Sequence, residues 1–263
     1  MKTLKLFIAG LLAVFLPIFS IASVEVAGSL SHKHTGKPGD IYTGTIDIVN
    51  HSDIDQEVKI YQTDFLFNYE GKTFYDEPES HNRSNAGWIT YSPTFTILKA
   101  KEIQHIQYEV KIPGNDSLVG TYWSIIMVEG VEPIIPGQKG QLNINTTMRY
   151  GVQIVTKMGK TGIGKLRFMK PSLTVEDDNL FLDVNIENTG ERVISPIVTA
   201  EFFDETGKSI KVFEVPKNGM YPTTSARFRF KIEGIEGKKT YQVLIIADGG
   251  DDDVFGLETT LNL

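Results

Sequence analysis

The sequence contains no cysteine among its 263 residues. Disulfide bonds are therefore excluded, and so is a thiol nucleophile. A lipid-modified cysteine cannot tether the chain to a membrane either. Without covalent cross-links the fold has to rely on hydrophobic cores, and the chain is long enough to bury sizeable ones.

Long apolar runs are also scarce, and the one that stands out extends from Leu6 to Phe19. It follows Lys2 and Lys5 and precedes Ser20-Ile21-Ala22, the small-x-small pattern that signal peptidase recognises. A membrane-spanning helix needs roughly 20 apolar residues, more than this run offers. We therefore expect residues 1–22 to be a cleaved signal peptide and the mature chain to be exported without a membrane span, to the periplasm or the outside of the cell envelope.

The sequence has fewer basic residues than acidic ones. Once Lys2 and Lys5 leave with the signal peptide, 24 basic residues face 33 acidic ones, a net charge of −9. Nucleic acid binding requires a basic surface that neutralises phosphates. The composition thus excludes a nucleic-acid partner and disfavours docking onto anionic lipid.

The mature sequence is dominated by alternation of apolar and polar residues with a period of two. The alternation is clear from Ile103 to Ile112, from Leu180 to Ile186 and from Phe228 to Ile232. Clusters of turn-forming residues such as Glu176–Asn179 separate these runs. Short strands with one polar face are typical of two-sheet sandwiches. The sequence therefore predicts an all-β protein with two tandem immunoglobulin-like β-sandwich domains.

The boundary between the domains is expected at a glycine-containing segment, Met158–Gly164. Three glycines interrupt the alternation there, and a new strand is predicted over Lys165–Val175. The predicted domains are residues 23–158, a PapD-like or immunoglobulin-like sandwich, and residues 163–263. The same segment matches the GxxxxGK spacing of a phosphate loop, but Leu166 replaces the required hydroxyl and a strand follows instead of a helix. We interpret it as a linker.

No residue set points to catalysis, so we predict a non-enzymatic protein without a cofactor. The five histidines are scattered, and no serine lies in a strand-turn-helix elbow. A weak calcium candidate is the acidic loop around Gly249-Gly250, because glycines allow several carboxylates to approach one ion. Its acidic residues are Asp248, Asp251, Asp252 and Asp253. The favoured alternative is a solvated turn between two strands, where Asp and Gly are common, with no metal bound.

Four aromatic residues, Trp88, Tyr91, Tyr122 and Trp123, offer a platform on which sugar rings could stack. Aromatic residues in strands more often fill the core of a sandwich. The core interpretation is therefore favoured over a glycan site.

One predicted strand, Gln141–Thr156, is much longer than the five or six residues typical of strands. It exceeds what one sheet needs, so its outer part is a candidate edge. An exposed edge offers unpaired N–H and C=O groups to a strand from another chain. The alternative is a bent strand shared by the two sheets of one sandwich.

Short motifs within residues 24–157 resemble a family of exported sandwich proteins. These motifs are Lys37–Asp40, Thr45–Asn50, Val58–Phe65, Ser84–Ile89, Ser92-Pro93, Phe95–Leu98, Val110–Pro113 and Gly120–Ser124. Together they are most similar to the N-terminal domain of the WxL-interacting bacterial surface proteins. They are more distantly similar to the first domain of PapD-like periplasmic pilus chaperones.

The resemblance implies a binding mode. In such chaperones the last long strand of the first domain lends apolar residues to an incomplete subunit, and a basic residue on it anchors the subunit's C-terminal carboxylate. Carried over, the partner-binding residues are Leu142, Ile144, Met148, Tyr150 and, for the carboxylate, Arg149, whose planar fork suits that group.

The chaperones also have an arginine on their first strand, where this sequence reads Ser31-His-Lys-His34. The expected function is recognition of an envelope or surface protein subunit by strand addition, as a chaperone-like protein in surface or pilus assembly. The alternative is a module that binds peptidoglycan or a surface glycan.

Overall fold

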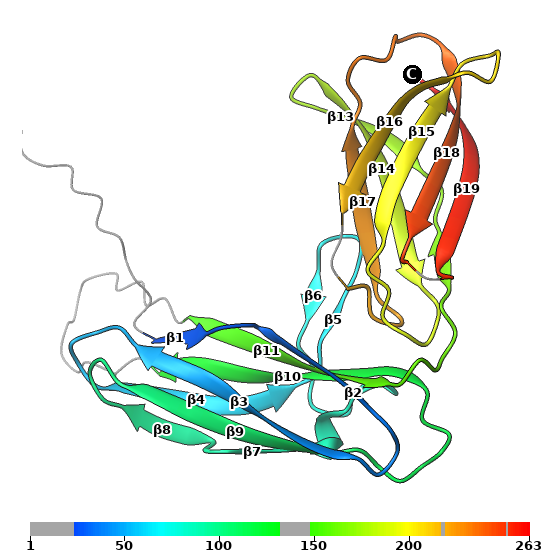
Figure 1. The fold of residues 1–263 in the computed structure, drawn as a ribbon. Coiled ribbons are helices and arrows are strands. Elements are labelled where there is room, and N and C mark those ends of the chain that lie inside the picture. The colour runs from blue at the N-terminus through cyan, green and yellow to red at the C-terminus, as the bar shows by residue number, and fades with distance from the viewer. Residues whose placement is uncertain (1–23, 132–147, 217–218, 251) are drawn as a thin grey trace, which may run out of the picture.

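The computed structural model describes residues 24–131, 148–216, 219–250 and 252–263, so the predicted signal peptide lies outside the described residues (Figure 1). Regular structure in this part is almost entirely β-strand, with a single 3₁₀ turn, η1 (Ala86–Trp88). Figure 1 shows two elongated β-sandwiches that meet at one end. The predicted fold class, all-β with tandem sandwiches, is confirmed.

The first sandwich consists of two sheets and a small hairpin. One sheet has the order β1 (Val24–Ala27), β3 (Ile41–Asn50), β9 (Ile103–Lys111) and β7 (Ile89–Ser92). The other has the order β2 (Ser31–Gly36), β11 (Arg149–Met158), β10 (Gly120–Val131), β4 (Gln56–Thr63) and β8 (Phe95–Leu98). The hairpin consists of β5 (Leu66–Phe67) and β6 (Thr73–Phe74), and it extends toward the second sandwich (Figure 1).

The second sandwich also has two sheets. In one, β14 (Asn179–Asn188) pairs with β12 (Leu166–Phe168), β13 (Ser172–Glu176) and β17 (Ser225–Lys231). The other has the order β16 (Ser209–Pro216), β15 (Ile197–Phe203), β18 (Thr240–Asp248) and β19 (Val254–Asn262).

Each sandwich has a hydrophobic core of its own, built by the period-two alternation. In the first, Ile48 and Ile106 project inward from neighbouring strands and are fully buried. In the second, Leu182, Phe202 and Phe228 do the same. Burial of an aliphatic or aromatic side chain contributes about 1.5–3 kcal/mol, so these inward rows account for stability without disulfides.

Two predicted strands differ from the observed ones. The strand predicted over Lys165–Val175 is divided into β12 and β13, because Pro171 lacks the N–H that the ladder to β14 would use. The strand predicted over Gln141–Thr156 is described only from Met148, and its ladder runs from Arg149 to Met158.

The two sandwiches are joined by backbone hydrogen bonds as well as by the chain. The amide of Thr121 donates to the carbonyl of Glu191 at 2.9 Å, and the amide of Val193 donates to the Thr121 hydroxyl at 3.0 Å. Gly120 has φ +77°, and an added Cβ would lie 2.0 Å from the Glu191 carbonyl oxygen. Only glycine fits this close approach.

None of the helical turns in the described ranges has the length and hydrophobicity that a membrane crossing requires.

Candidate functional site

Strand β11 lacks a partner along part of one side. It pairs antiparallel with β10 along its whole length, from Arg149 to Met158. On its other side β2 pairs with it in parallel, but only from Gln153 onward. Among the described residues, Arg149 to Val152 have no strand on that side, and we call this stretch the open edge.

The point at which β2 begins follows from the path of the preceding chain. The chain crosses from one sheet to the other at Gly28, whose φ of +89° favours glycine. The carbonyl oxygen of Leu30 then accepts the amide of Gln153 at 2.9 Å. Because backbone polar groups alternate between the two sides of a strand, those of Arg149 and Gly151 point the same way as those of Gln153. The open edge therefore presents two residues whose N–H and C=O groups can pair with an added strand.

The side chains at the open edge divide between the two faces of the sheet. Val152 is buried in the core, and Tyr150 packs at its margin. Met148, directly before β11, is 51% exposed. Of the predicted partner-binding residues, Leu142 and Ile144 lie outside the described ranges. Arg149 and Tyr150 lie at the open edge, and Met148 directly precedes it.

Arg149 lies on the outer face, beside a surface hollow of about 590 Å³. Its guanidinium is hydrogen-bonded with Tyr61, whose hydroxyl donates to Glu129 at 2.6 Å. Burial, followed by the bond to Glu129, raises the pKa of Tyr61. Arg149 keeps free donors for an incoming carboxylate, but Glu129, its register partner on β10, would repel that carboxylate.

A second hollow, of about 780 Å³, lies between the two sandwiches. Gln153 contributes to its lining, so this interdomain cleft begins where the open edge ends. Its lining includes Lys33, Lys72 and Arg227 and no carboxylate among the described residues. Lys72 is paired with Glu70 at 2.7 Å. Lys33, by contrast, makes no ion pair within the described part of the chain.

Sequence reasoning missed Lys33 as a site residue. The signal was present, because Ser31-His-Lys-His34 occupies the stretch where the resembling chaperones carry an arginine. In the structure Lys33 lies on β2, in register with Val155 of β11. A lysine at this point can neutralise an anion as a point charge, although without the bidentate geometry of arginine.

Tyr221 lines the floor of the cleft, and Trp123 is fully buried behind it. Trp123 of β10 stacks on Tyr221 of the second sandwich, with ring centroids 4.7 Å apart. The Tyr221 hydroxyl donates to the side-chain oxygen of Gln153 at 2.6 Å, and burial raises the pKa of Tyr221 to about 12. These contacts fix the second sandwich against β11, beside the open edge.

The four aromatic residues considered for sugar stacking do not form an exposed platform. Trp123 is fully buried, and the ring of Trp88 lies 4.7 Å from that of Tyr122. Trp88 and Tyr91 pack against the core of the first sandwich. The favoured core interpretation accounts for these contacts, and a glycan site built on these rings does not.

The acidic loop around Gly249-Gly250 forms the turn between β18 and β19. A carboxylate oxygen of Asp248 accepts the Gly250 amide at 2.8 Å, and Asp253 is paired with Arg192 at 2.7 Å. Asp252 is exposed, while Asp251 lies outside the described residues. Within the described ranges, no group of three or more His, Asp and Glu side chains is placed to hold a metal ion. The described contacts of Asp248 and Asp253 are typical of a turn, and whether the loop binds calcium stays a prediction.

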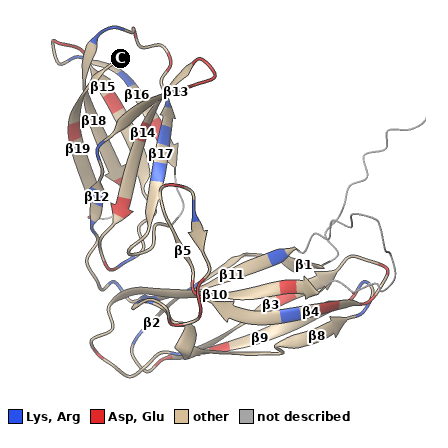
Figure 2. Cartoon of the chain, turned by 180° about the vertical axis from the view of Figure 1, so that it is seen from behind, with Lys and Arg blue, Asp and Glu red and all other residues tan. Residues whose placement is uncertain are grey.

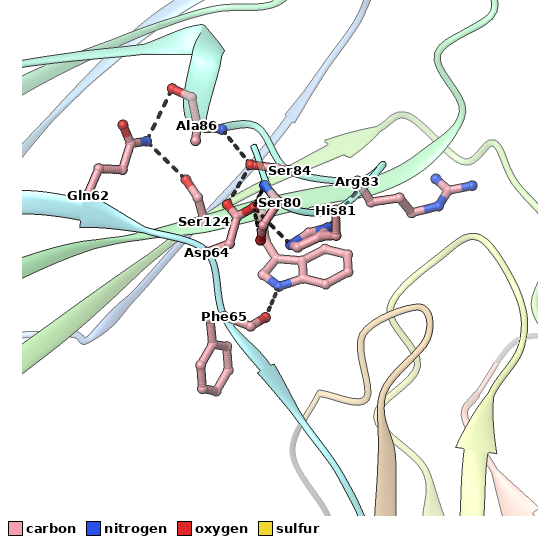
Figure 3. A network of polar contacts seen from close by, with 10 residues as sticks. Gln62, Asp64, Phe65, Ser80, His81, Arg83, Ser84, Ala86 and Ser124 are labelled. Atoms are coloured by element: carbon pink, nitrogen blue, oxygen red, sulfur yellow. Dashed lines mark hydrogen bonds and ion pairs between the residues drawn. The ribbon is translucent and has the colours of Figure 1, made fainter. Parts of the chain in front are cut away.

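A buried polar network that the sequence did not reveal lies next to the cleft (Figure 3). Asp64 is fully buried and accepts the amide and hydroxyl of Ser80, at 2.7 and 3.0 Å, and the hydroxyl of Ser84 at 2.5 Å. Both serine hydroxyls donate directly to Asp64, and neither hydroxyl is hydrogen-bonded to the His81 ring. The arrangement is therefore structural and does not match the relay of a serine hydrolase.

His81 lies between this network and the cleft floor. Its Nδ1 accepts the amide of Arg83 at 3.2 Å, so the neutral ring carries its proton on Nε2. That Nε2 is buried without a hydrogen-bond partner among the described residues, 3.8 Å from a carboxylate oxygen of Asp64. Burial lowers the pKa of His81, against the opposing charges of Asp64 and Asp76.

We expect the free energy of unfolding to fall as the pH is lowered from about 7 toward 5, through the unfolded-state pKa of histidine near 6.5. In this window the unfolded chain takes up a proton that His81 in the folded chain does not bind, so acid favours unfolding. Urea unfolding at a series of pH values measures the effect, with His81→Gln as the comparison. A variant curve as steep as that of the wild type would contradict the assignment.

Comparisons with known proteins leave the family open. No protein-family model and no curated protein matches this sequence, so the resemblance to WxL-interacting proteins finds no support there. Solved structures with similar folds include fimbrial chaperones and their complexes. One is a chaperone–tip adhesin complex of CFA/I fimbriae biogenesis, with 15% identity, 91% of this chain and 98% of that chain covered, and a TM-score of 0.49.

Two further complexes are similar at comparable levels. One is the SafB chaperone with the SafA pilin of Salmonella enterica, with 14% identity, coverage of 92% and 97%, and a TM-score of 0.43. The other is the CsuC–CsuE pre-assembly complex of the archaic Csu pili of Acinetobacter baumannii, with 13% identity, coverage of 90% and 98%, and a TM-score of 0.44. Similarities at this level do not assign this chain a family or a function.

Proposed function

We propose that this chain is a non-enzymatic, exported envelope protein that binds a protein partner by adding one of its strands at the open edge of β11. The observation that carries the proposal is the ladder itself, which is complete toward β10 and stops at Gln153 toward β2. Residues 1–22 would serve as the export signal, and the two domains would span residues 23–158 and 163–263. The partner would be a subunit of surface or pilus assembly, held in a chaperone-like manner.

The interdomain cleft supports this mode of binding. A strand that runs along the open edge toward Gln153 meets the cleft, whose described lining has cations but no carboxylate. A chain terminus that ends there would find Lys33 available for its carboxylate. Arg149 remains the other candidate for that carboxylate, at the far end of the open edge. Met148 and Tyr150, with Leu142 and Ile144 before them, would contact the partner's apolar side chains.

The test separates backbone pairing from side-chain contact. Arg149→Pro removes the side chain together with an N–H that points to the open edge, whereas Arg149→Ala removes only the side chain. We expect Arg149→Pro to abolish capture of the partner from envelope extract, as identified by mass spectrometry, and Arg149→Ala to reduce capture less. Equal capture by the wild type and Arg149→Pro, with the variant shown to be folded by circular dichroism, would refute strand addition.

The carboxylate anchor is tested in the same assay. Lys33→Ala is expected to weaken capture if the partner's terminus reaches the cleft, and Lys33→Arg is expected to restore it. Loss in Arg149→Ala with no effect in Lys33→Ala would assign the anchor to Arg149 instead. Amidation of the identified partner's C-terminus should have the same effect as loss of the anchor.

A further inference from the structure

The second sandwich presents an outer sheet face on which the described strands place no cation. On the β16-β15-β18-β19 sheet, inward residues fill the core, and alternate residues point outward. The outward residues include Glu201, Glu214 and Glu258 but no lysine or arginine. None of these three carboxylates makes an ion pair or hydrogen bond with a described residue. We call this outer surface the acidic face.

The carboxylates of the acidic face surround an apolar centre. The register places Glu201 and Glu258 on either side of Leu244 in one cross-strand row. Strands in a sheet lie about 4.8 Å apart, so these two charged positions are separated by roughly 10 Å. In the next row Ile246 lies between Thr199 and Gly256, with Glu214 beyond Thr199.

The margins of the face are also apolar and exposed. Val212 on β16, Ile197 on β15 and Val254 on β19 are 53%, 46% and 56% exposed. A face that mixes an apolar centre with carboxylates of one sign differs from an ordinary solvated sheet, where both signs are interspersed.

The opposite face of the same sandwich shows that ordinary pattern. There Arg229 of β17 is paired with Asp183 and Glu176, and Arg167 of β12 is paired with Glu187. Figure 2 shows blue bands on β17 and red bands on β15 and β19. The one lysine or arginine on the strands of this sheet, Lys211 of β16, is in register with the buried Phe202 and so belongs to the inward row. The absence of cations from the outward positions is therefore particular to the acidic face and does not follow from the net charge of the chain alone.

Gly256 leaves the centre of the face uncovered on one side. Its φ is not positive, and an added Cβ would meet only the Ile245 carbonyl oxygen, at 3.8 Å. The backbone therefore does not require glycine here, and a side chain would fit. Without one, no side chain from β19 covers the partly exposed Ile246 beside it.

We propose that the acidic face docks a second protein, through a segment that places lysine or arginine side chains around an apolar side chain. The unpaired carboxylates would pair with the cations, while Leu244 and Ile246 would pack against the apolar group. Charges of one sign steer a partner of the opposite sign and disfavour others. An anionic membrane surface is disfavoured for the same reason. The surface is separate from the open edge of β11 and would serve a different partner or a different part of the same one.

The experiment uses the full mature chain with a photo-crosslinking residue, p-benzoylphenylalanine, in place of Gly256. Irradiation in envelope extract is expected to link it to one protein, through a segment that contains lysine or arginine. The same residue in place of Ser172, on the opposite sheet, is the matched control and should not give this product. The cross-linked peptide is identified by mass spectrometry.

Charge reversal then tests the chemistry of the contact. Glu214→Lys with Glu258→Lys should lower the yield of the product at least about tenfold, because like charges would face each other. Asp116→Lys with Glu57→Lys, which changes the net charge equally but on the first sandwich, should leave the yield unchanged. Raising the salt concentration should also lower it.

Three outcomes would overturn the proposal: products identical to those of the Ser172 control, a linked segment without lysine or arginine, or a yield that charge reversal leaves unchanged. Arg149→Pro should not affect this product if the two surfaces are independent, so failure here is distinguishable from failure of strand addition.

Discussion

Trp123→Ala is expected to lower the free energy of unfolding by about 3–5 kcal/mol, the range for large aromatic residues removed from a core. Trp123 is fully buried, and its indole N–H donates to the Phe65 carbonyl at 2.8 Å. Its ring also contacts Tyr221 and His81, at 4.7 and 4.6 Å between centroids. Alanine would leave a cavity at the place where hairpin, loop and second sandwich meet.

The substitution should also uncouple the two sandwiches. With Trp123 in place, Tyr221 holds the second sandwich against the first, and we expect one cooperative denaturant transition. In Trp123→Ala each sandwich keeps its own core, so we expect two transitions and a broader interdomain distribution in small-angle scattering. Trp88→Ala is the control, because Trp88 lies away from the cleft. A single transition at nearly unchanged denaturant concentration in Trp123→Ala would contradict the assigned role.

The period-two pattern was sufficient to predict the class of fold and the positions of most strands. The alternation from Ile103 to Ile112 predicts β9, and that from Leu180 to Ile186 predicts the centre of β14. Strand β10 shows where the pattern stops being informative. All its residues from Gly120 to Val128 are buried, and at Thr121 and Trp123 the outer face is covered by the hairpin and the second sandwich. An alternation rule cannot recognise Trp123 as a junction residue.

The candidate site was predicted only in part, for a physical reason. The sequence indicated a long strand with a possible edge, and Arg149 and Tyr150 are found there. Which residues of an edge stay unpaired depends on where the neighbouring strand ends. Here that depends on the crossing at Gly28 and on the hydrogen bond from Gln153 to Leu30. Such long-range register is not contained in a local pattern.

Asp64 was missed because a buried carboxylate has no local signal. Residues 76–87 are mostly polar, and the sequence gives no sign of which of them turn inward. In the structure Ser80 and Ser84 of this loop turn inward and donate to Asp64. A buried charge is tolerated only when hydrogen bonds compensate its lost hydration. The loop is thus ordered by one acidic residue that precedes it by more than ten positions.

Asp64→Ala is therefore expected to destabilise the first sandwich by about 2–4 kcal/mol, since each buried donor left unsatisfied costs about 1–3 kcal/mol. The backbone N–H of Ser80 is fixed in direction, unlike a hydroxyl, so it cannot turn toward another acceptor. Asp64→Asn should cost less, because its carbonyl oxygen can accept from Ser80 while the Ser84 hydroxyl rotates to accept from the amide. Denaturant unfolding measures both, and hydrogen exchange of the Ser80 amide reports the loop directly. Equal stabilities for the two variants would contradict this account.

Asp64→Asn also tests how the network is linked to His81. The Asp64 carboxylate lies 3.8 Å from Nε2 and works against burial by favouring the charged imidazolium. The neutral side-chain amide introduced by Asp64→Asn removes that attraction, so we expect the pKa of His81 to fall further below its usual range in this variant. The loss of stability in acid should then continue to lower pH than in the wild type, because the folded chain leaves His81 unprotonated over a wider window. An NMR titration of the His81 ring in both proteins measures the shift, and an unchanged midpoint would show that the two side chains are not coupled.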